Sequence, residues 1–419
     1  MNKSYSSQLF RLPNSFSKYY LFLFLLWPFI AFLVALTNYD QKESRKVVYM
    51  FLIYYGLTFV LGNTDADSVR YALYLKSIAE LPFSNFFQIV GGLYITGTTV
   101  DIIAPLISFI VSRFTSNHSV LFAVYAAIFG FFYLKSINQL YNRYREKPGW
   151  NAMIFMAFFI IILPITTING FRMWTATWIF FYGAYHVILY RDARYLLIAL
   201  GSSLVHFSFL SANAVLLIYF FAGNRNFIYI PIALASFVLP QLIAPVFQSI
   251  SLKLGGSLQN RFETYANEGY VMGAREALEQ SKWFMKIGND LVFYYLLLAI
   301  IVIQLKSGNL MKEKAERNIF SFLLLFLSFV NFGKGIPSFG GRFQIIFFLF
   351  ATLYVFLYFL KLPGNKVNLL TMLGLFPMVL YAAITFRLGF DSISAWILTP
   401  GLGLPLLVPA LSISDFLFH

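Results

Sequence analysis

The sequence contains no cysteine and very little charge. Of its 419 residues, only 11% are Asp, Glu, Lys or Arg, and none is Cys. The lack of cysteine excludes disulfide bonds, thiolate metal sites and cysteine nucleophiles. A soluble domain usually carries about 25% charged residues, so this chain has too little charge to cover a surface exposed to water. Because 59% of the residues are hydrophobic and the mean hydropathy is +0.72, the composition predicts a polytopic membrane protein.

Motifs for metal or nucleotide cofactors are also missing. The four histidines are far apart in the sequence and form no H-x-x-x-H or His/Cys cluster. There is no P-loop and no dinucleotide-binding G-x-G-x-x-G, which argues against a cytoplasmic ATPase or kinase. Asp65 and Asp67 form a D-x-D pair, which can hold a divalent cation in soluble sugar-nucleotide transferases, but acids at this spacing are common by chance. We therefore expect no metal and no other cofactor.

Charge of one sign is in excess. The chain has 31 Lys and Arg against 17 Asp and Glu, a formal net charge of +14, which can indicate nucleic-acid binding. However, the basic residues lie in short clusters between apolar runs, as expected when Lys and Arg hold loops on the cytoplasmic side of a membrane. Membrane topology explains most of the charge, and no nucleic-acid partner is predicted.

The apolar runs have the length of membrane-spanning helices. A helix needs about 20 apolar residues to cross the hydrocarbon core, so the sequence predicts an all-α protein with about 12 to 14 such helices. We expect one domain over residues 1–419, without a cleavable signal peptide. The predicted segments are 19–38, 46–62, 98–114, 119–136, 151–168, 171–190, 194–207, 208–222, 227–247, 290–305, 318–333, 342–361, 366–385 and 393–411.

Short basic loops indicate which side of the membrane each segment faces. Lys and Arg are concentrated in cytoplasmic loops. The loops assigned to the cytoplasm for this reason are 135–149, 190–195, 306–317 and 361–366.

Two long loops then fall on the outer side. The first, 62–97, contains the D-x-D pair, and the second, 248–289, is the longest polar stretch of the chain. Loops held by a rigid scaffold are common places for functional sites. This orientation requires either 98–114 or part of 194–222 to be re-entrant instead of spanning.

Two arginines stand directly before apolar helices on the outer side. Arg172 lies in INGFRMWTATW and Arg342 in SFGGRFQIIFF. A guanidinium offers a planar set of donors that suits phosphate oxygens and stays charged at physiological pH, so both are candidates for phosphate binding. The alternative is that they only anchor helix ends at the headgroups, although anchoring arginines favour the cytoplasmic face. Arg261, Arg275 and Lys334 either complete such a cluster or belong to solvated loops.

Acids and one histidine are candidates for proton transfer or sugar binding. Asp65, Asp67 and Arg70 lie together in LGNTDADSVRY. His206 lies in an apolar helix, and an ionisable group within a membrane is a functional candidate by default. Its neutral imidazole could take a proton from a sugar hydroxyl, or it could be satisfied by a neighbouring serine or carbonyl. Tyr265, in the second long loop, is a candidate for stacking on a sugar ring.

In this order, the motifs resemble those of the Wzy-type polymerases of O-antigen and other polysaccharides, particularly the EpsG-like branch. In that branch an early outer loop has the form G-x-D followed by a tyrosine, which GNTDADSVRY matches. An arginine then opens a helix, matched by INGFRMWTATW, and an apolar helix ends in a histidine, matched by LLIALGSSLVHF. A Gly-Arg precedes an aromatic helix late in the chain, matched by GGRFQIIFF. The resemblance covers about residues 45–360.

The resemblance implies a GT-C-like helical glycosyltransferase in the bacterial inner membrane, with its active site facing the periplasm. It implies transfer of a growing glycan from undecaprenyl diphosphate to a lipid-linked repeat unit, with arginines holding the diphosphate and stabilising the charge of the leaving group. The candidate bases are then His206, Asp65, Asp67 and Glu263, an Asp of the first loop being preferred. Such systems usually need a separate chain-length regulator as a partner.

Two alternative functions fit the sequence less well. One is a flippase or other transporter of lipid-linked oligosaccharides, and the other is an O-antigen ligase. A flippase should place its charges along a central cavity inside the spans. In this chain the charges gather at one face and in two long outer loops, which favours the polymerase.

Overall fold

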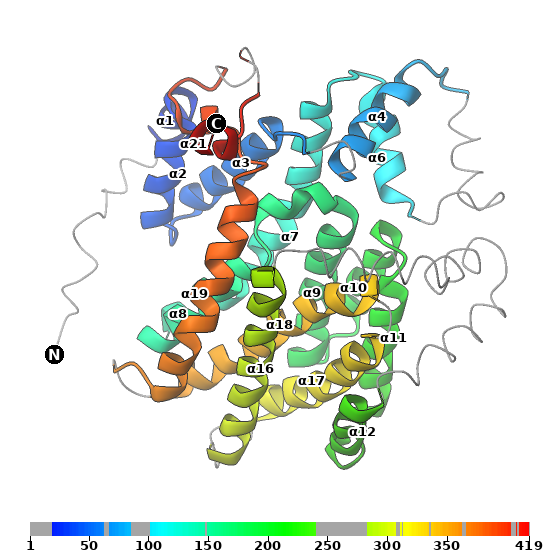
Figure 1. The fold of residues 1–419 in the computed structure, drawn as a ribbon, viewed down its shortest axis with the longest axis vertical. Coiled ribbons are helices and arrows are strands. Elements are labelled where there is room, and N and C mark those ends of the chain that lie inside the picture. Colours follow the sequence, from blue (N-terminus) through cyan, green and yellow to red (C-terminus); the bar gives the residue numbers. More distant parts are fainter. Residues whose placement is uncertain are drawn as a thin grey trace.

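The computed structural model of the protein is a bundle of helices (Figure 1). It describes residues 19–62, 67–84, 101–146, 149–239, 283–306, 311, 313–334, 337–362, 366–403, 408 and 410–418. Within these ranges there is no β-strand, only an isolated antiparallel bridge between Ser394 and Ser412. The predicted all-α fold is confirmed.

Most of the described chain is helical. In order, the helices are α1 (Tyr20–Leu26), α2 (Pro28–Thr37), α3 (Lys42–Leu57), α4 (Asp67–Ala79), α6 (Ile103–Ser112), α7 (His118–Glu146), α8 (Trp150–Ile162), the 3-10 helix η2 (Ile165–Gly170), α9 (Phe171–Tyr190), α10 (Arg194–Val205), α11 (Phe209–Ala222), α12 (Asn226–Val238), α16 (Trp283–Lys306), α17 (Lys314–Gly333), α18 (Pro337–Lys361), α19 (Leu369–Gly389), the 3-10 helix η3 (Ala395–Leu398) and α21 (Ile413–Phe418).

In the described part of the chain, six apolar stretches are long enough to cross a membrane. Five lie in α7, α16, α17, α18 and α19, and the sixth is the 41-residue stretch Trp150–Tyr190, which contains α8, η2 and α9. The chain is therefore a multi-pass membrane protein, as predicted. Other predicted segments form helices of only 10 to 14 residues, namely α2, α6, α10, α11 and α12. The prediction of about 12 to 14 spans included these segments, whose described helices are shorter than the hydrocarbon core.

The stretch Trp150–Tyr190 is broken at Pro164, between α8 and η2. Proline has no N–H, and the last carbonyl groups of a helix need partners from outside that helix. Aromatic side chains of α7, α19 and α9 donate to these carbonyl oxygens. Tyr133 donates to the Ile160 carbonyl (3.0 Å), Tyr381 donates to the Ile162 carbonyl (2.9 Å), and Trp178 donates to the Leu163 carbonyl (3.2 Å).

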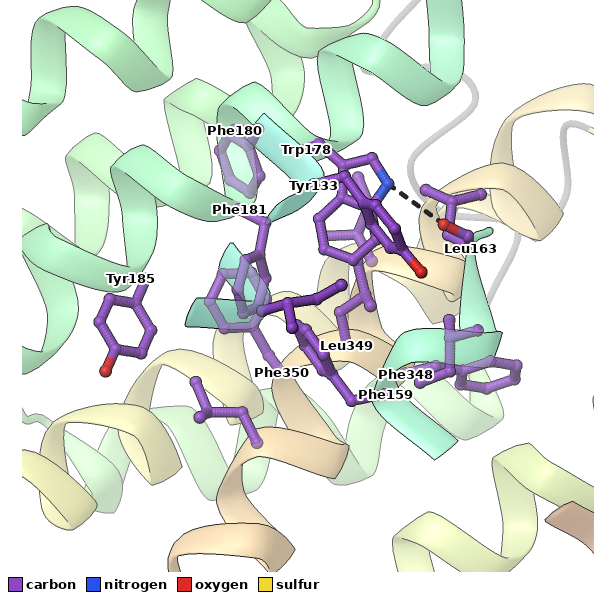
Figure 2. Close-up of a cluster of buried hydrophobic side chains, with 14 of the residues drawn as sticks. Tyr133, Phe159, Leu163, Trp178, Phe180, Phe181, Tyr185, Phe348, Leu349 and Phe350 are labelled. Atoms are coloured by element: carbon purple, nitrogen blue, oxygen red, sulfur yellow. Dashed lines mark hydrogen bonds between the residues drawn. The ribbon is translucent and has the colours of Figure 1, made fainter. Parts of the chain in front are cut away.

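Figure 2 shows the bond from Trp178 to Leu163 inside an aromatic core. The Trp178 ring meets Phe159 and Phe181 edge-on or nearly so, with ring centroids 5.7 and 6.0 Å apart. Phe181 also packs against Phe350 of α18 at 4.7 Å. These contacts hold the end of α8 against α9 and α18. Both candidate sites described below include residues close to this break.

Helix α6, within the predicted segment 98–114, is shorter than a membrane-spanning helix. It has 10 residues, about 15 Å in length, which is half of the hydrocarbon core. Directly after it, Arg113 donates to the carbonyl oxygens of Ile78 and, at 2.6 Å, Leu81, both at the end of α4. The end of α6 thus lies beside the end of α4 in the described structure, and the re-entrant path of this segment stays a prediction. Figure 1 shows α4 and α6 side by side at one end of the bundle.

The predicted span at 393–411 is wrong. Within the described residues of this segment, only the four-residue η3 is helical, and the chain then turns at Gly401, whose φ of +92° favours glycine. The segment instead packs on the N-terminal helices. Trp27 Nε1 donates to the Leu398 carbonyl (2.8 Å), and the Gly401 N–H donates to the Leu26 carbonyl (2.7 Å).

The two ends of the bundle differ in their polar groups. At one end, Lys361 pairs with Glu316 (3.0 Å), and Arg143 donates to the Tyr190 hydroxyl (2.8 Å); we call this the basic end. The opposite end contains Asp101, the start of α9 and the break between α10 and α11, and we call it the Asp101 end.

Candidate active site

Asp101, which precedes α6, is the centre of a buried polar cluster. Its side chain is only 7% exposed. Oδ1 accepts from the Phe207 N–H (2.8 Å), and Oδ2 accepts from Nη1 of Arg172 (2.9 Å). Nδ1 of His206 lies 3.2 Å from both oxygens. The cluster thus joins the start of α6, the start of α9 and the break between α10 and α11, and we call it the Asp101 cluster.

His206 reaches Asp101 because the chain is extended between α10 and α11. The φ and ψ angles of His206 are −147° and 117°, which ends α10 and leaves the Phe207 N–H free to bind the carboxylate. The partial positive charge at the start of α11 also favours an anion here. A backbone bond from Ile102 N–H to the Leu204 carbonyl (3.1 Å) holds the two segments together. His206 therefore has a carboxylate partner, not the serine or carbonyl of the alternative interpretation.

Arg172, the second residue of α9, is held by two partners. Nη1 pairs with Asp101, and Nε donates to the Tyr71 hydroxyl of α4 (2.9 Å). The guanidinium also lies 5.7 Å from the centroid of the Tyr71 ring. Tyr71 packs edge-on against Tyr125 (5.6 Å), which stacks on Phe171 with centroids 3.7 Å apart. This aromatic column ties α4, α7 and α9 together and directs Arg172 toward Asp101.

The cluster keeps Asp101 ionised. Burial by itself raises the pKa of the Asp101 carboxyl. The hydrogen bond from His206, the charge of Arg172 and the Phe207 N–H outweigh this effect, so the pKa of Asp101 lies below its ordinary value of 3.8. Burial raises the pKa of the Tyr71 hydroxyl, with Arg172 opposing, so Tyr71 stays protonated at neutral pH.

An ionised Asp101 determines which nitrogen of His206 carries the proton. Nδ1–H donates to the carboxylate, so Nε2 keeps its lone pair and can accept a proton. A buried carboxylate orients the histidine base of Ser-His-Asp enzymes in the same way. None of the described residues forms a hydrogen bond with Nε2. His206 thus has the arrangement of a general base supported by Asp101.

Helix α4 brings part of the D-x-D loop to the rim of the Asp101 cluster. Asp67 is the first residue of α4 and lies 3.4 Å from Nη1 of Arg70. Its charge also acts on Arg172 and Tyr71. Both Asp67 and Arg70 are more exposed than Asp101, so they face any molecule that enters from this end.

Arg342 lies on a different site, a cavity of about 360 Å³ next to the start of α9. Asn169 and Trp174, which flank Arg172 in the sequence, also line this cavity, whereas Arg172 does not. Residues two apart on a helix point to nearly opposite faces, so the cavity and the Asp101 cluster lie on opposite sides of residues 169–174. The structure therefore places the two sequence-predicted arginines in neighbouring but separate sites.

Lys334, which follows α17, packs with its backbone beside Gly340 of α18, next to the cavity-lining residues Gly341 and Arg342. Its Nζ lies 4.1 Å from the centroid of the Phe293 ring on α16. Burial lowers the pKa of the Lys334 ammonium, and the charge of Asp290 opposes this effect. Asp290 follows Asn289, which lines the cavity. Lys334 is therefore a neighbour of the cavity but does not line it.

Several sequence-predicted site residues lie outside the described residues, so their positions stay a prediction. They are Asp65, Arg261, Glu263, Tyr265 and Arg275. Among the residues that the structure does describe, no group of three or more His, Cys, Asp or Glu could hold a metal ion.

Asp101, the centre of the cluster, is not among the candidate residues that the sequence predicted. Its signal was a lone carboxylate at the start of the apolar run DIIAPLISFIV, in a chain where charge is scarce. Arg172 and His206 are 71 and 105 residues away from it in the sequence. The spacing of motifs could therefore not reveal that the three side chains meet.

Comparisons with curated proteins and with solved structures find no match. The model of the EpsG family matches residues 49–397, a range that covers most of the chain and all of the Asp101 cluster. The resemblance seen in the sequence is thereby confirmed. The chain belongs to the EpsG family, and this membership, together with its apolar helices, indicates a membrane glycosyltransferase related to polysaccharide polymerases.

Proposed function

We propose that this protein is a polysaccharide polymerase that transfers a growing glycan from undecaprenyl diphosphate to a lipid-linked repeat unit at the periplasmic face of the membrane. The observation that carries the proposal is the Asp101–His206 pair at one end of a membrane bundle. Glycosyl transfer to a hydroxyl is accelerated by a group that removes the hydroxyl proton. A buried histidine oriented by a carboxylate is suited to that task, and the membership of the EpsG family supports the same reaction.

The reaction exchanges one bond at the anomeric carbon of the donor sugar. The acceptor hydroxyl oxygen attacks this carbon while Nε2 of His206 takes the hydroxyl proton. The bond from the anomeric carbon to the diphosphate oxygen breaks, and undecaprenyl diphosphate leaves with the electron pair. Asp101 stabilises the imidazolium that forms on His206. Arginine side chains balance the negative charge that develops on the leaving diphosphate.

In this proposal the base is His206 and not an Asp of the first loop. Asp67 is partly exposed and pairs with Arg70, whereas His206 is buried and oriented by Asp101. Its position at the rim suits it to orient the acceptor sugar through hydrogen bonds to hydroxyl groups. Arg70 can do the same from the following turn of α4.

The orientation in the membrane is supported by the basic residues. Lys361 and Arg143 mark the end of the bundle opposite Asp101. Basic residues collect on the cytoplasmic side of membrane proteins, so in a bacterial inner membrane the Asp101 end faces the periplasm. A chain-length regulator would meet the protein on this side.

Purified protein supplied with lipid-linked repeat units tests the proposal. The wild type should produce a ladder of longer glycans, and His206→Gln should lower the rate of extension by about 10²–10⁴-fold, because it removes the base. His186→Gln is a matched control. His186 is also a histidine within the bundle, but it stacks on Tyr195 (3.8 Å) at the basic end, so this variant should extend glycans like the wild type.

Other outcomes would contradict the proposal. Movement of lipid-linked oligosaccharides across liposomes without glycan extension would favour a flippase. Transfer of glycan only to a different class of acceptor would favour an O-antigen ligase. A normal ladder from His206→Gln would show that His206 is not the base.

A further inference from the structure

The cavity beside the Asp101 cluster exists because α8 is short. Helix α8 has 13 residues, about 20 Å in length, which is shorter than the hydrocarbon core. Helix α19 continues past this end, since Tyr381 contacts the Ile162 carbonyl and the helix extends to Gly389. The resulting cavity of about 360 Å³ is walled by α8, η2, α9, α16, α18 and α19. Ligand sites commonly have volumes of about 300–1,000 Å³.

The lining combines a charged head region with an apolar region. Arg342 precedes Ile345 by one turn of α18, and both line the cavity, so the guanidinium lies nearer the start of the helix and the aliphatic group lies deeper. On α19, Ile384 and Leu388 add apolar lining, and Leu388 is 47% exposed on the surface of the bundle. An amphiphile with an anionic head and a hydrocarbon tail matches this lining and could enter from the bilayer.

Arg342 is available to bind an anion. No salt bridge within the described residues involves Arg342, whereas Arg172 is already held by Asp101 and Tyr71. A guanidinium without an acidic partner matches two phosphate oxygens at once. The backbone of Lys334 packs beside Gly340, two residues before Arg342, but its ammonium lies over the Phe293 ring and outside the cavity lining.

We infer that this cavity binds the diphosphate and the first isoprene units of the prenyl diphosphate donor. The inference rests on the proposed function and divides the work between two arginines: Arg342 binds the diphosphate, and Arg172 positions Asp101. The donor fits better than the acceptor lipid because its diphosphate is bonded to the reacting anomeric carbon. The acceptor hydroxyl is separated from its own diphosphate by the repeat unit. Asn169 and Trp174 place the cavity at the start of α9, across residues 169–174 from Arg172 and the Asp101 cluster.

Gly341 allows the cavity to be filled without disturbing its neighbours. It lines the cavity, and a Cβ added to it would meet no atom within 4 Å. Gly341→Leu should therefore occupy the space of the ligand. Gly201, within α10, is a matched control, because an added Cβ also meets no atom within 4 Å and Gly201 does not line the cavity.

Equilibrium binding of radiolabelled farnesyl diphosphate to the full-length protein in detergent tests the inference. The wild type and Gly201→Leu should bind it with the same Kd. Arg342→Gln and Gly341→Leu should each raise the Kd by about 10- to 100-fold, because the first removes a charge-assisted hydrogen bond and the second fills the cavity. Unlabelled farnesol and inorganic diphosphate should each compete more weakly than unlabelled farnesyl diphosphate.

The outcomes for this inference and for the proposed function can be told apart. An unchanged Kd in Arg342→Gln or Gly341→Leu would overturn the inference, and so would inorganic diphosphate that competes as well as farnesyl diphosphate. His206→Gln should bind farnesyl diphosphate like the wild type and yet fail to extend glycans. Glycan extension by a wild type that does not bind farnesyl diphosphate would overturn the inference alone. Binding without extension would refute the proposed function and support the cavity as a prenyl diphosphate site.

Discussion

At the scale of single residues, Asp101 determines what two other side chains can do. A carboxylate in an apolar environment is costly unless it is paired and hydrogen-bonded, and Asp101 meets this condition through donors from Phe207, Arg172 and His206. The same bonds orient the imidazole of His206 and occupy the guanidinium of Arg172. In the proposed function, this one buried acid orients His206 as the base and occupies the guanidinium of Arg172, which therefore mainly neutralises the carboxylate.

Asp101→Asn should reduce both glycan extension and the pH dependence of stability. The amide has the shape of the carboxyl but no charge, so His206 loses the fixed proton position and extension should fall by about 10²–10⁴-fold. In the wild type the folded-state pKa of Asp101 is lowered from the ordinary value of 3.8. Its stabilisation is therefore complete above that value and is lost as the pH falls through the folded-state pKa.

Thermal unfolding in detergent measures this effect. The Tm of Asp101→Asn should lie below that of the wild type at neutral pH, in line with a loss of about 1.5–3 kcal/mol for hydrogen bonds to a charged group. The two Tm values should converge as the pH falls below 3.8. A difference that stays constant down to that pH would mean that ionised Asp101 does not stabilise the fold.

At the scale of helices, the close packing of α10 on α9 sets the position of His206. A Cβ added to Gly183 of α9 would lie 2.5 Å from the backbone nitrogen of Ala199 in α10. Small residues allow helices in membranes to approach this closely. The position of His206 at the end of α10 therefore depends on a contact seven residues earlier in that helix, far from any polar group of the cluster.

Gly183→Val should disturb the Asp101 cluster without changing any residue in it. The added side chain pushes α10 away from α9, and overpacking of this kind costs about 1–3 kcal/mol. We expect a lower Tm and a reduced rate of glycan extension. Gly201→Val, in open space on α10, should change neither quantity by a comparable amount. A Gly183→Val protein with wild-type extension would show that the spacing of α9 and α10 does not position His206.

At the scale of the whole molecule, both sites lie at one end of the bundle. This arrangement requires α6 to return to the side of α4, which the bonds from Arg113 to Ile78 and Leu81 support. The basic residues then lie at the other end. In the proposed function, both lipid-linked substrates would therefore reach the protein from one face of the membrane.

Single-cysteine labelling tests this topology directly, because the chain contains no native cysteine. Ser84→Cys, after α4, and Ser116→Cys, after α6, should both react with a membrane-impermeant maleimide added to the outside of intact spheroplasts. Lys314→Cys, at the start of α17 and the basic end, should react only after the membrane is opened. All three positions are exposed in the structure. Reaction of Ser84→Cys and Ser116→Cys from opposite sides would mean that α6 spans the membrane.

Much of this organisation follows from local features of the sequence. Low charge and long apolar runs require helices, because each backbone polar group in a bilayer must be paired within its own segment. Arg172 and His206 stand out as ionisable groups at the ends of apolar helices. The short basic loops mark one end of the bundle. Each of these features can be recognised in the sequence without knowing which helices are in contact.

The sequence alone therefore determined the all-α membrane fold, the short basic loops that mark one end of the bundle, and two of the three central residues of the Asp101 cluster. Only the tertiary structure decided that Asp101 joins Arg172 to His206, and that Arg342 faces a separate cavity. The physical reason is that these relations depend on where helices break and how they are rotated. Both are set by packing between residues far apart in the chain, such as Trp178 against Leu163 and Gly183 against Ala199.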